Sequence, residues 1–334
     1  MNFFQILSEI EKVDPEVYDR LDSRRRVFKN MAGMGQKLSA AALPLFVSSV
    51  FNKVYAQTPA GLSVANVLNF ALKLEYLEMY FYQARTGITS QLSSVNSAAL
   101  ATIATDEANH VKFLTGALGT AAIPNPTAAA FDFTAKGTFP TALTSAATYL
   151  AVAQSLEDTG VRAYKGAAPL TTVMADKNVL TAALNIHSIE ARHASHIRSM
   201  RRGGSLATNA TPSNSVAVAP YSAQPKSWIS GTDSGGAGGT ATAPVYGKGN
   251  DGADSTGKFA TYGATNQVGT TAGVTFLAED NVVQGGVTLS PSTITSITFP
   301  TGTTAFSEAF DEGLDVGTVA TIANLFSVSG TYFN

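Results

Sequence analysis

Two segments of the chain, Asp106-Glu107-Ala108-Asn109-His110 and Ile189-Glu190-Ala191-Arg192-His193, carry the same pattern, Glu-x-x-His. In a helix this spacing places the carboxylate and the imidazole on one face. Each pattern follows a glutamate in an otherwise apolar run. Glu75 lies 32 residues before Glu107, and Glu157 lies 33 residues before Glu190. The sequence therefore repeats the same arrangement, a glutamate followed by a Glu-x-x-His pattern, and each copy spans a pair of predicted helices.

The segments around these residues are predicted to be four helices of an all-α bundle. The expected ranges are about Ser63–Arg85, Ser93 or Ser94 to Gly119, about Pro140 to Gly166, and from after Pro169 to Gly203. The first and third connections are short, so each pair should be antiparallel neighbours. About twenty residues, including Pro124 and Pro126, join the second helix to the third. Short, long and short connections are typical of a four-helix bundle with one crossover.

Four glutamates and two histidines facing one core require compensation, because burying one unpaired carboxylate costs several kcal/mol. Two divalent cations would balance the four carboxylates and leave the imidazoles neutral. Oxygen and imidazole ligands suit iron and manganese. The chain has no cysteine, which excludes thiolate nucleophiles, iron–sulfur clusters and cysteine zinc sites.

The paired motifs resemble the ferritin-like superfamily, and within it rubrerythrin and the bacterial ferritin-like domain proteins. The resemblance covers about residues 62–203 and implies two Fe or Mn ions. It implies that Glu107 and Glu190 bridge the two ions, while Glu75 with His110 and Glu157 with His193 supply the outer ligands. The chain lacks the cysteine-rich module that serves rubrerythrin as an electron donor, and its long C-terminal segment is foreign to both relatives.

Four further residues are candidates for the surroundings of the ligands. Tyr82 and Tyr164 each follow a candidate glutamate by seven residues, and we expect them either to donate hydrogen bonds to carboxylates or to fill the core. Glu78 competes with Glu75 and is expected beside the ligands or at the surface. His187 lies one turn before Glu190; an ordinary half-buried histidine is the favoured interpretation, and a histidine reaching the cavity is the alternative.

Charged residues close to the motifs are expected to be solvated. Asp106 and Asp158 adjoin candidate ligands but point away from them, and His196 is expected at the surface. The arginines near the end of the fourth helix are expected to interact favourably with the helix dipole.

The composition of the 334-residue chain limits the classes of function. Only 14% of its residues are charged, against about 25% in an average soluble domain. The 22 basic and 24 acidic residues nearly balance, which argues against electrostatic binding of nucleic acid. No phosphate-binding glycine loop or Ser/His/Asp arrangement is evident.

Residues 1–57 carry the features of an export signal in the expected order. Arg24, Arg25 and Arg26 precede an apolar stretch over 38–51 and a small residue at Ala56. The paired arginines resemble the twin-arginine type, which predicts export to the periplasm or cell envelope. The stretch is too short to span a membrane. The alternative is an amphipathic helix that the mature protein retains.

Beyond the bundle, which we place at residues 58–204, residues 205–334 are rich in Gly, Ser and Thr. We expect loops and short strands there, at 273–277 and 294–299, and a short helix at 316–326. This extension is expected either to lie on the bundle or to form a contact surface, for a homo-oligomer or a surface assembly.

Three functions are compatible with these patterns. The first is an exported di-iron or di-manganese oxidoreductase acting on O₂, peroxide or Fe(II), with ferroxidase and catalase- or peroxidase-like chemistry both open. The second is a structural envelope protein that uses the bundle as a scaffold. The third is iron binding or storage.

Overall fold

The computed structural model describes residues 63–201, 225–229, 239–249, 276–284, 287–290 and 304–334. The export signal and the expected strand at 294–299 lie outside these residues. Export, and the division of the chain at residues 57 and 204, therefore stay predictions from the sequence.

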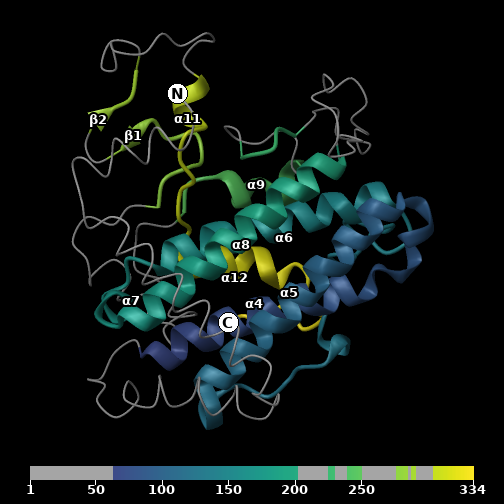
Figure 1. Ribbon diagram of the computed structural model, residues 1–334, viewed down its shortest axis with the longest axis horizontal. Coiled ribbons are helices and arrows are strands. Elements are labelled where there is room, and N and C mark those ends of the chain that lie inside the picture. The colour runs from purple at the N-terminus through teal and green to yellow at the C-terminus, as the bar shows by residue number, and fades with distance from the viewer. Residues whose placement is uncertain (1–62, 202–224, 230–238, 250–275, 285–286, 291–303) are drawn as a thin grey trace, which may run out of the picture.

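The centre of the molecule is the expected bundle of long helices, α4 (Val64–Gln83), α5 (Ser94–Leu118), α6 (Ala146–Ala167) and α8 (Lys177–Arg201) (Figure 1). Helix α4 packs along α5 and α6 packs along α8, whereas α4 with α6 and α5 with α8 make much sparser contacts. The side chains of Ser63, Ser93 and Ser145 accept hydrogen bonds from the first turns of α4, α5 and α6. Gly119 ends α5 with φ 56°, a conformation that favours glycine.

The third and fourth helices differ from the predicted boundaries. Helix α6 begins at Ala146 rather than near Pro140, because Ser145 is extended and caps it. The fourth segment is divided into one turn, α7 (Thr171–Ala175), and the long α8. The break lies at Asp176, whose carboxylate accepts hydrogen bonds from the backbone N–H groups of Asn178 and Val179 at 2.8 and 3.1 Å.

Short 3₁₀ turns occupy the connections. They are η1 (Ala84–Gly87) and η2 (Thr89–Gln91) between α4 and α5, and η3 (Gly119–Ala121) and η4 (Ala128–Ala130) in the crossover. The crossover pairs with the C-terminal end of the chain through a single bridge between Phe131 and Ser327. Short, long and short connections are thus present as expected.

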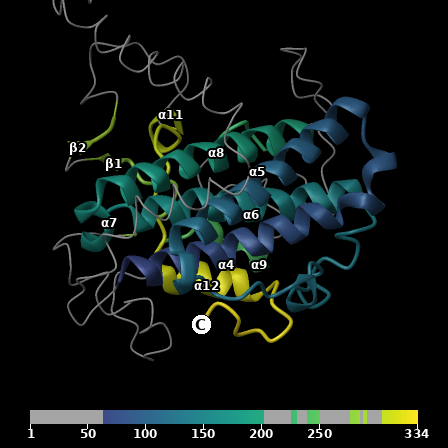
Figure 2. The same cartoon turned by 60° about the horizontal axis from the view of Figure 1, so that its bottom comes forward.

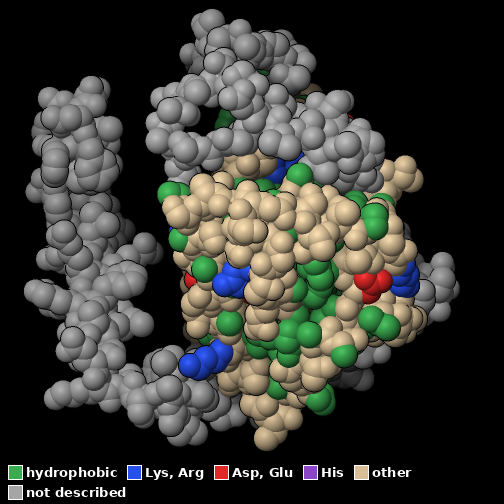
Figure 3. Space-filling model, turned by 90° about the vertical axis from the view of Figure 1, so that its right-hand side faces the viewer, with side chains coloured by type: hydrophobic (Ala, Val, Ile, Leu, Met, Phe, Trp, Pro, Cys, Tyr) green, Lys and Arg blue, Asp and Glu red, His purple; other side chains and the backbone are tan. Residues whose placement is uncertain are grey.

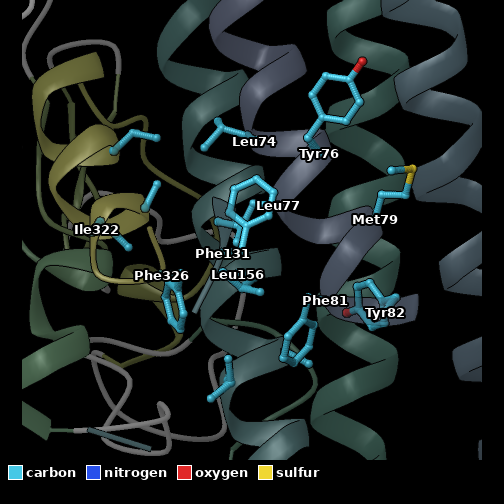
Figure 4. Close-up of a cluster of buried hydrophobic side chains, with 14 of the residues drawn as sticks. Leu74, Tyr76, Leu77, Met79, Phe81, Tyr82, Phe131, Leu156, Ile322 and Phe326 are labelled. Carbon is cyan, nitrogen blue, oxygen red and sulfur yellow. The ribbon is translucent and has the colours of Figure 1, made fainter. Parts of the chain in front are cut away.

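The apolar core extends beyond the bundle to the C-terminal helix α12 (Val316–Asn324). Figure 4 shows Leu74 and Leu77 of α4 and Leu156 of α6 on the side of Ile322 and Phe326. In Figure 2, α12 lies on the side of the bundle away from α5 and α8. The helix expected at 316–326 is therefore present, and it covers the seam between α4 and α6.

The other described parts of the C-terminal extension are short. They comprise α9 (Gly239–Tyr246), α11 (Thr304–Ser307) and an antiparallel pair, β1 (Val283–Gln284) with β2 (Val287–Thr288). The expected strand at 273–277 is wrong at its described end, because Phe276 and Leu277 belong to no strand. The sequence analysis missed the observed pair, although Gly285-Gly286 between two valine-containing runs is a hairpin signal.

A single buried arginine of α6 attaches the extension to the bundle. Arg162 donates hydrogen bonds to the carbonyl oxygens of Val245, Gly247, Leu277, Glu312 and Gly313. Its Nε also lies 2.7 Å from Glu279 Oε1, and both side chains are almost completely buried. The described parts of the extension therefore lie on the bundle, the first of the two expected arrangements.

The surface agrees with the low charged fraction of the sequence. On the face drawn in Figure 3, lysine, arginine and acidic side chains are few and separated. Among the described residues, no helix is long and apolar enough to cross a membrane.

Replacing Arg162 should loosen the parts of the extension that it binds. In Arg162→Met, the buried Glu279 and five backbone carbonyl oxygens lose their donor, so the free energy of unfolding should fall by about 3–5 kcal/mol. Chemical denaturation measures this loss, and limited proteolysis should cleave the extension faster. Lys226→Ala is the matched control, because it removes an ion pair with Glu308 in which the lysine is exposed, and it should cost less than about 1 kcal/mol. Equal losses in the two variants would contradict the role given to Arg162.

Candidate metal centre

The six residues expected to bind metal come together in the middle of the bundle. Ligand atoms of Glu75, Glu107, His110 and Glu190 lie within 4.8 Å of one another, and so do those of Glu107, Glu157, Glu190 and His193. The two groups share Glu107 and Glu190. All six residues are buried. The arrangement is therefore two adjoining cation positions with two carboxylates in common.

Both imidazoles turn Nδ1 toward the shared carboxylates. His110 Nδ1 lies 3.1 Å from Glu75 Oε2, 3.1 Å from Glu107 Oε2 and 3.3 Å from Glu190 Oε1. His193 Nδ1 lies 2.8 Å from Glu107 Oε1 and 3.3 Å from Glu157 Oε2. Each histidine thus presents the same nitrogen to a different cation position.

The two tyrosines cross between the helices. Tyr82 of α4 donates a hydrogen bond to Glu157 Oε1 of α6, and Tyr164 of α6 donates one to Glu75 Oε1 of α4. Both tyrosines are buried, and neither merely fills the core. Each one fixes the outer glutamate of the opposite helix pair, while the other oxygen of that glutamate faces its histidine.

Several buried ligand atoms have no hydrogen-bond partner. These atoms are both carboxylate oxygens of Glu190, Oε1 of Glu107, Oε2 of Glu157 and Nδ1 of His193. A buried charged oxygen without a donor is strongly unfavourable. Oxygen and nitrogen lone pairs converging on two points are the donor set that Fe or Mn ions accept. The residues present therefore fit two such ions.

The pKa values of the cluster show how unfavourable it is without a cation. Burial raises the pKa of Glu107 to about 7, although hydrogen bonds with His110 and His193 act in the opposite direction. Burial and the charge of Glu107 raise the pKa of Glu190 well above its usual range. Burial opposes the charged form of both imidazoles, but the surrounding carboxylates raise the pKa of His110 and His193. Without cations, Glu107 and Glu190 are therefore biased toward their protonated forms.

Glu78 is a fifth buried carboxyl beside the cluster. Its expected position at the surface is wrong, since it is 4% exposed; the alternative position beside the ligands holds. Burial and repulsion from Glu190 and Glu107 raise its pKa well above the usual range. The raised pKa favours the neutral form of Glu78, which would leave the cluster with the four carboxylates that two divalent ions would balance. Helix α12 covers Glu78, because Ile322 and Ala323 line the small cavity that Glu78 and Gly160 border.

Gly160 of α6 makes room for one of the shared carboxylates. A Cβ atom at this position would lie 2.9 Å from Glu190 Oε2 and 3.4 Å from Cδ. The sequence analysis did not single out Gly160, since a glycine inside a helix carries no mark of what it touches. The close approach identifies it as a residue that positions Glu190.

Two expectations about nearby charges are corrected. Asp158 is completely buried rather than solvated, because it pairs with the buried Arg198 and accepts a hydrogen bond from Tyr246 at 2.8 Å. The dipole interpretation of the arginines is therefore incomplete for Arg198. Arg201 is also buried and donates to Gln154.

The remaining charged neighbours lie at the edge of the centre. The side chain of Asp106 is 38% exposed, yet its Oδ2 lies 3.2 Å from His193 Nε2. His187 does not join the cluster; its Nδ1 lies 2.9 Å from the carbonyl oxygen of Val161, as the ordinary interpretation expects. His196 is half-buried rather than fully at the surface.

Comparison with known families gives one match. Residues 63–202 match the model of the family described as "Ferritin-like domain". This range contains α4 to α8 and all six clustered residues. Searches of curated proteins and of solved structures found no match.

Adding a methyl group at Gly160 should weaken metal binding without lowering the stability of the fold. Gly160→Ala improves the helix propensity of α6 by about 1 kcal/mol, but it displaces the Glu190 carboxylate. We expect unchanged or higher thermal stability together with weaker Mn²⁺ binding, measured by calorimetry. Gly317→Ala, at a position of α12 remote from the cluster, is the control for propensity alone. Unchanged Mn²⁺ affinity in Gly160→Ala would contradict the role assigned to this glycine.

The metal-free chain should lose stability as the pH rises from about 5 to 8. Where a group has a higher pKa in the folded chain, the folded state binds more protons than the unfolded state, so the free energy of unfolding falls with rising pH. Glu107, Glu190, Glu78 and both histidines shift this way, and Glu75, whose pKa His110 lowers against the effect of burial, opposes them.

Thermal unfolding of the protein after metal removal by a chelator, measured between about pH 5 and 8, tests whether its stability falls as the pH rises. Glu107→Gln should weaken the dependence between about pH 5 and 7. A stability that rises with pH would contradict the charge state given to the cluster.

Proposed function

We propose that the chain, whose residues 63–202 belong to the ferritin-like superfamily, is a di-metal oxidoreductase acting on O₂, peroxide or Fe(II). The observation that carries the proposal is the pair of adjoining ligand groups that share Glu107 and Glu190. A single structural cation needs one such group. Two positions with common carboxylates suit a reaction in which two electrons are exchanged with one small molecule.

The residues of the chain have distinct roles in this proposal. Glu107 and Glu190 would bridge the two ions, Glu75 with His110 would hold one ion, and Glu157 with His193 would hold the other. Two Fe or Mn ions bound there would supply one-electron redox chemistry between the +2 and +3 states. Tyr82 and Tyr164 hold the outer carboxylates in place through their hydroxyl groups. They also hold the protons closest to the outer ligands.

The burial of the centre bears on the chemistry. The side chains of Glu75, Glu107 and Glu190 have no exposed surface, and His110 is 11% exposed. A site closed in this way admits small molecules such as O₂, peroxide or a metal ion and excludes bulky substrates. Because the chain has no cysteine, it carries no cysteine-bound iron donor of the rubrerythrin kind.

Loading the full chain with Fe or Mn and supplying oxidant tests the proposal. We expect about two ions per chain and consumption of peroxide or oxidation of added Fe(II). Glu107→Ala should lose most of the bound metal, because it removes a carboxylate common to both ligand groups, whereas His110→Ala should lose about one of the two ions. His187→Ala is the matched control, since this histidine lies on the same helix as His193 but its Nδ1 meets the carbonyl oxygen of Val161 and not the cluster.

The outcomes separate the alternatives. A chain that binds two ions without oxidant turnover would favour iron binding or storage, and particle sizing would then show whether a cage forms. A folded chain without metal after growth in metal-rich medium would contradict the proposal and favour the structural alternative.

A further inference from the structure

A carboxylate, Asp106, lies behind the histidine of one cation position, and this difference between the two positions predicts an order of binding. Building on the proposed function, we propose that the position at Glu157 and His193 binds its ion first and more tightly than the position at Glu75 and His110. The residue responsible is Asp106, which orients His193.

The ligands themselves do not distinguish the two positions. Exchanging the helix pair α4–α5 with α6–α8 exchanges Glu75 with Glu157, Tyr82 with Tyr164, Glu107 with Glu190 and His110 with His193. The offset is 82 residues in the first helix of each pair and 83 in the second. Both outer glutamates accept a hydrogen bond from a tyrosine of the other pair. Any difference in affinity must therefore come from outside this set.

The symmetry is broken next to the histidines. Asp106 precedes Glu107, and the corresponding residue before Glu190 is Ile189. Asp106 Oδ2 lies 3.2 Å from His193 Nε2, the nitrogen that faces away from the cluster. Isoleucine offers no acceptor, and among the described residues none accepts a hydrogen bond from His110 Nε2. One imidazole thus has a carboxylate partner on its outer nitrogen and the other has none.

A carboxylate behind a metal-binding imidazole strengthens the ligand. When Nε2–H donates to Asp106, the proton is fixed on that nitrogen, Nδ1 keeps its lone pair for the ion, and the ring cannot rotate freely. Loss of such a partner typically weakens metal binding by about 10–100-fold. Because the Asp106 side chain is 38% exposed, we expect the lower end of this range.

A second break in the symmetry does not favour either position. Glu78 corresponds to Gly160, and both border the cavity under α12. Glu78 is repelled most by Glu190 and Glu107, the carboxylates common to both positions. Gly160 likewise touches the shared Glu190. These two residues act on the bridge, so Asp106 remains the feature that separates the two positions.

The difference has a functional consequence. The position at Glu75 and His110 would therefore exchange its ion with solution more readily than the position at Glu157 and His193. It would be the position at which Fe(II) arrives as a substrate.

Calorimetric titration of the chelated full chain with Co²⁺ tests the order without any measurement of turnover. We expect two steps in the unaltered chain. Asp106→Asn should weaken the tighter step about 10-fold and leave the weaker step unchanged. His193→Ala should abolish the tighter step, whereas His110→Ala should retain it. Ile189→Asp, which supplies the missing carboxylate, should strengthen the weaker step.

The test has a matched control variant, and some of its possible results would contradict the inference. Asp280→Asn removes the same charge at an exposed position outside the bundle and should change neither step. Far-UV circular dichroism identifies any variant that fails to fold, and Asp106→Asn and Ile189→Asp act independently of each other. Two equal steps, or an Asp106→Asn titration identical to that of the unaltered chain, would overturn the inference and leave the proposed function standing. Absence of any Co²⁺ binding would overturn both.

Discussion

The burial of four glutamates and two histidines in one bundle core is the constraint on which the rest of the structure depends. Among the described residues, Glu190 Oε2 lies in the core without a hydrogen-bond donor, and the other carboxylate oxygens of the cluster meet only imidazoles and tyrosines. An apolar core would be more stable than a cluster of this kind. The tyrosines and Gly160 hold this cluster in one geometry, and the buried Glu78 lies beside it. A centre that binds cations accounts for such an arrangement, because the cations would compensate the buried carboxylates.

The C-terminal extension supports the helix that carries part of this cluster. Arg162 lies on the helix that supplies Glu157 and Tyr164, and it binds carbonyl oxygens from three separate parts of the extension. Helix α12 closes the seam between α4 and α6 next to Glu78. Tyr246 reaches Asp158, the neighbour of Glu157. The described parts of the extension therefore support α6 from behind and exclude water from one side of the centre.

The sequence predicts the bundle and the six clustered residues because periodicity and the Glu-x-x-His spacing are local features. It fails where the result depends on a distant partner. Asp158 is expected in solvent because it points away from the ligand face of its helix, whereas its partner Arg198 belongs to a neighbouring helix. Arg162 and Gly160 carry no local signal, since the loops of the extension and the carboxylate of Glu190 reach them only after folding. The late start of α6 shows that Ser145 outweighs a proline suited to a first turn.

The most direct test of the central claim is the anomalous diffraction of crystals of the full chain loaded with Mn²⁺. Two peaks in the middle of the bundle are expected, both within bonding distance of Glu107 and Glu190. One peak should adjoin Glu75 and His110, and the other should adjoin Glu157 and His193. A bundle core without a peak, or with an ion that does not touch the shared glutamates, would contradict the account.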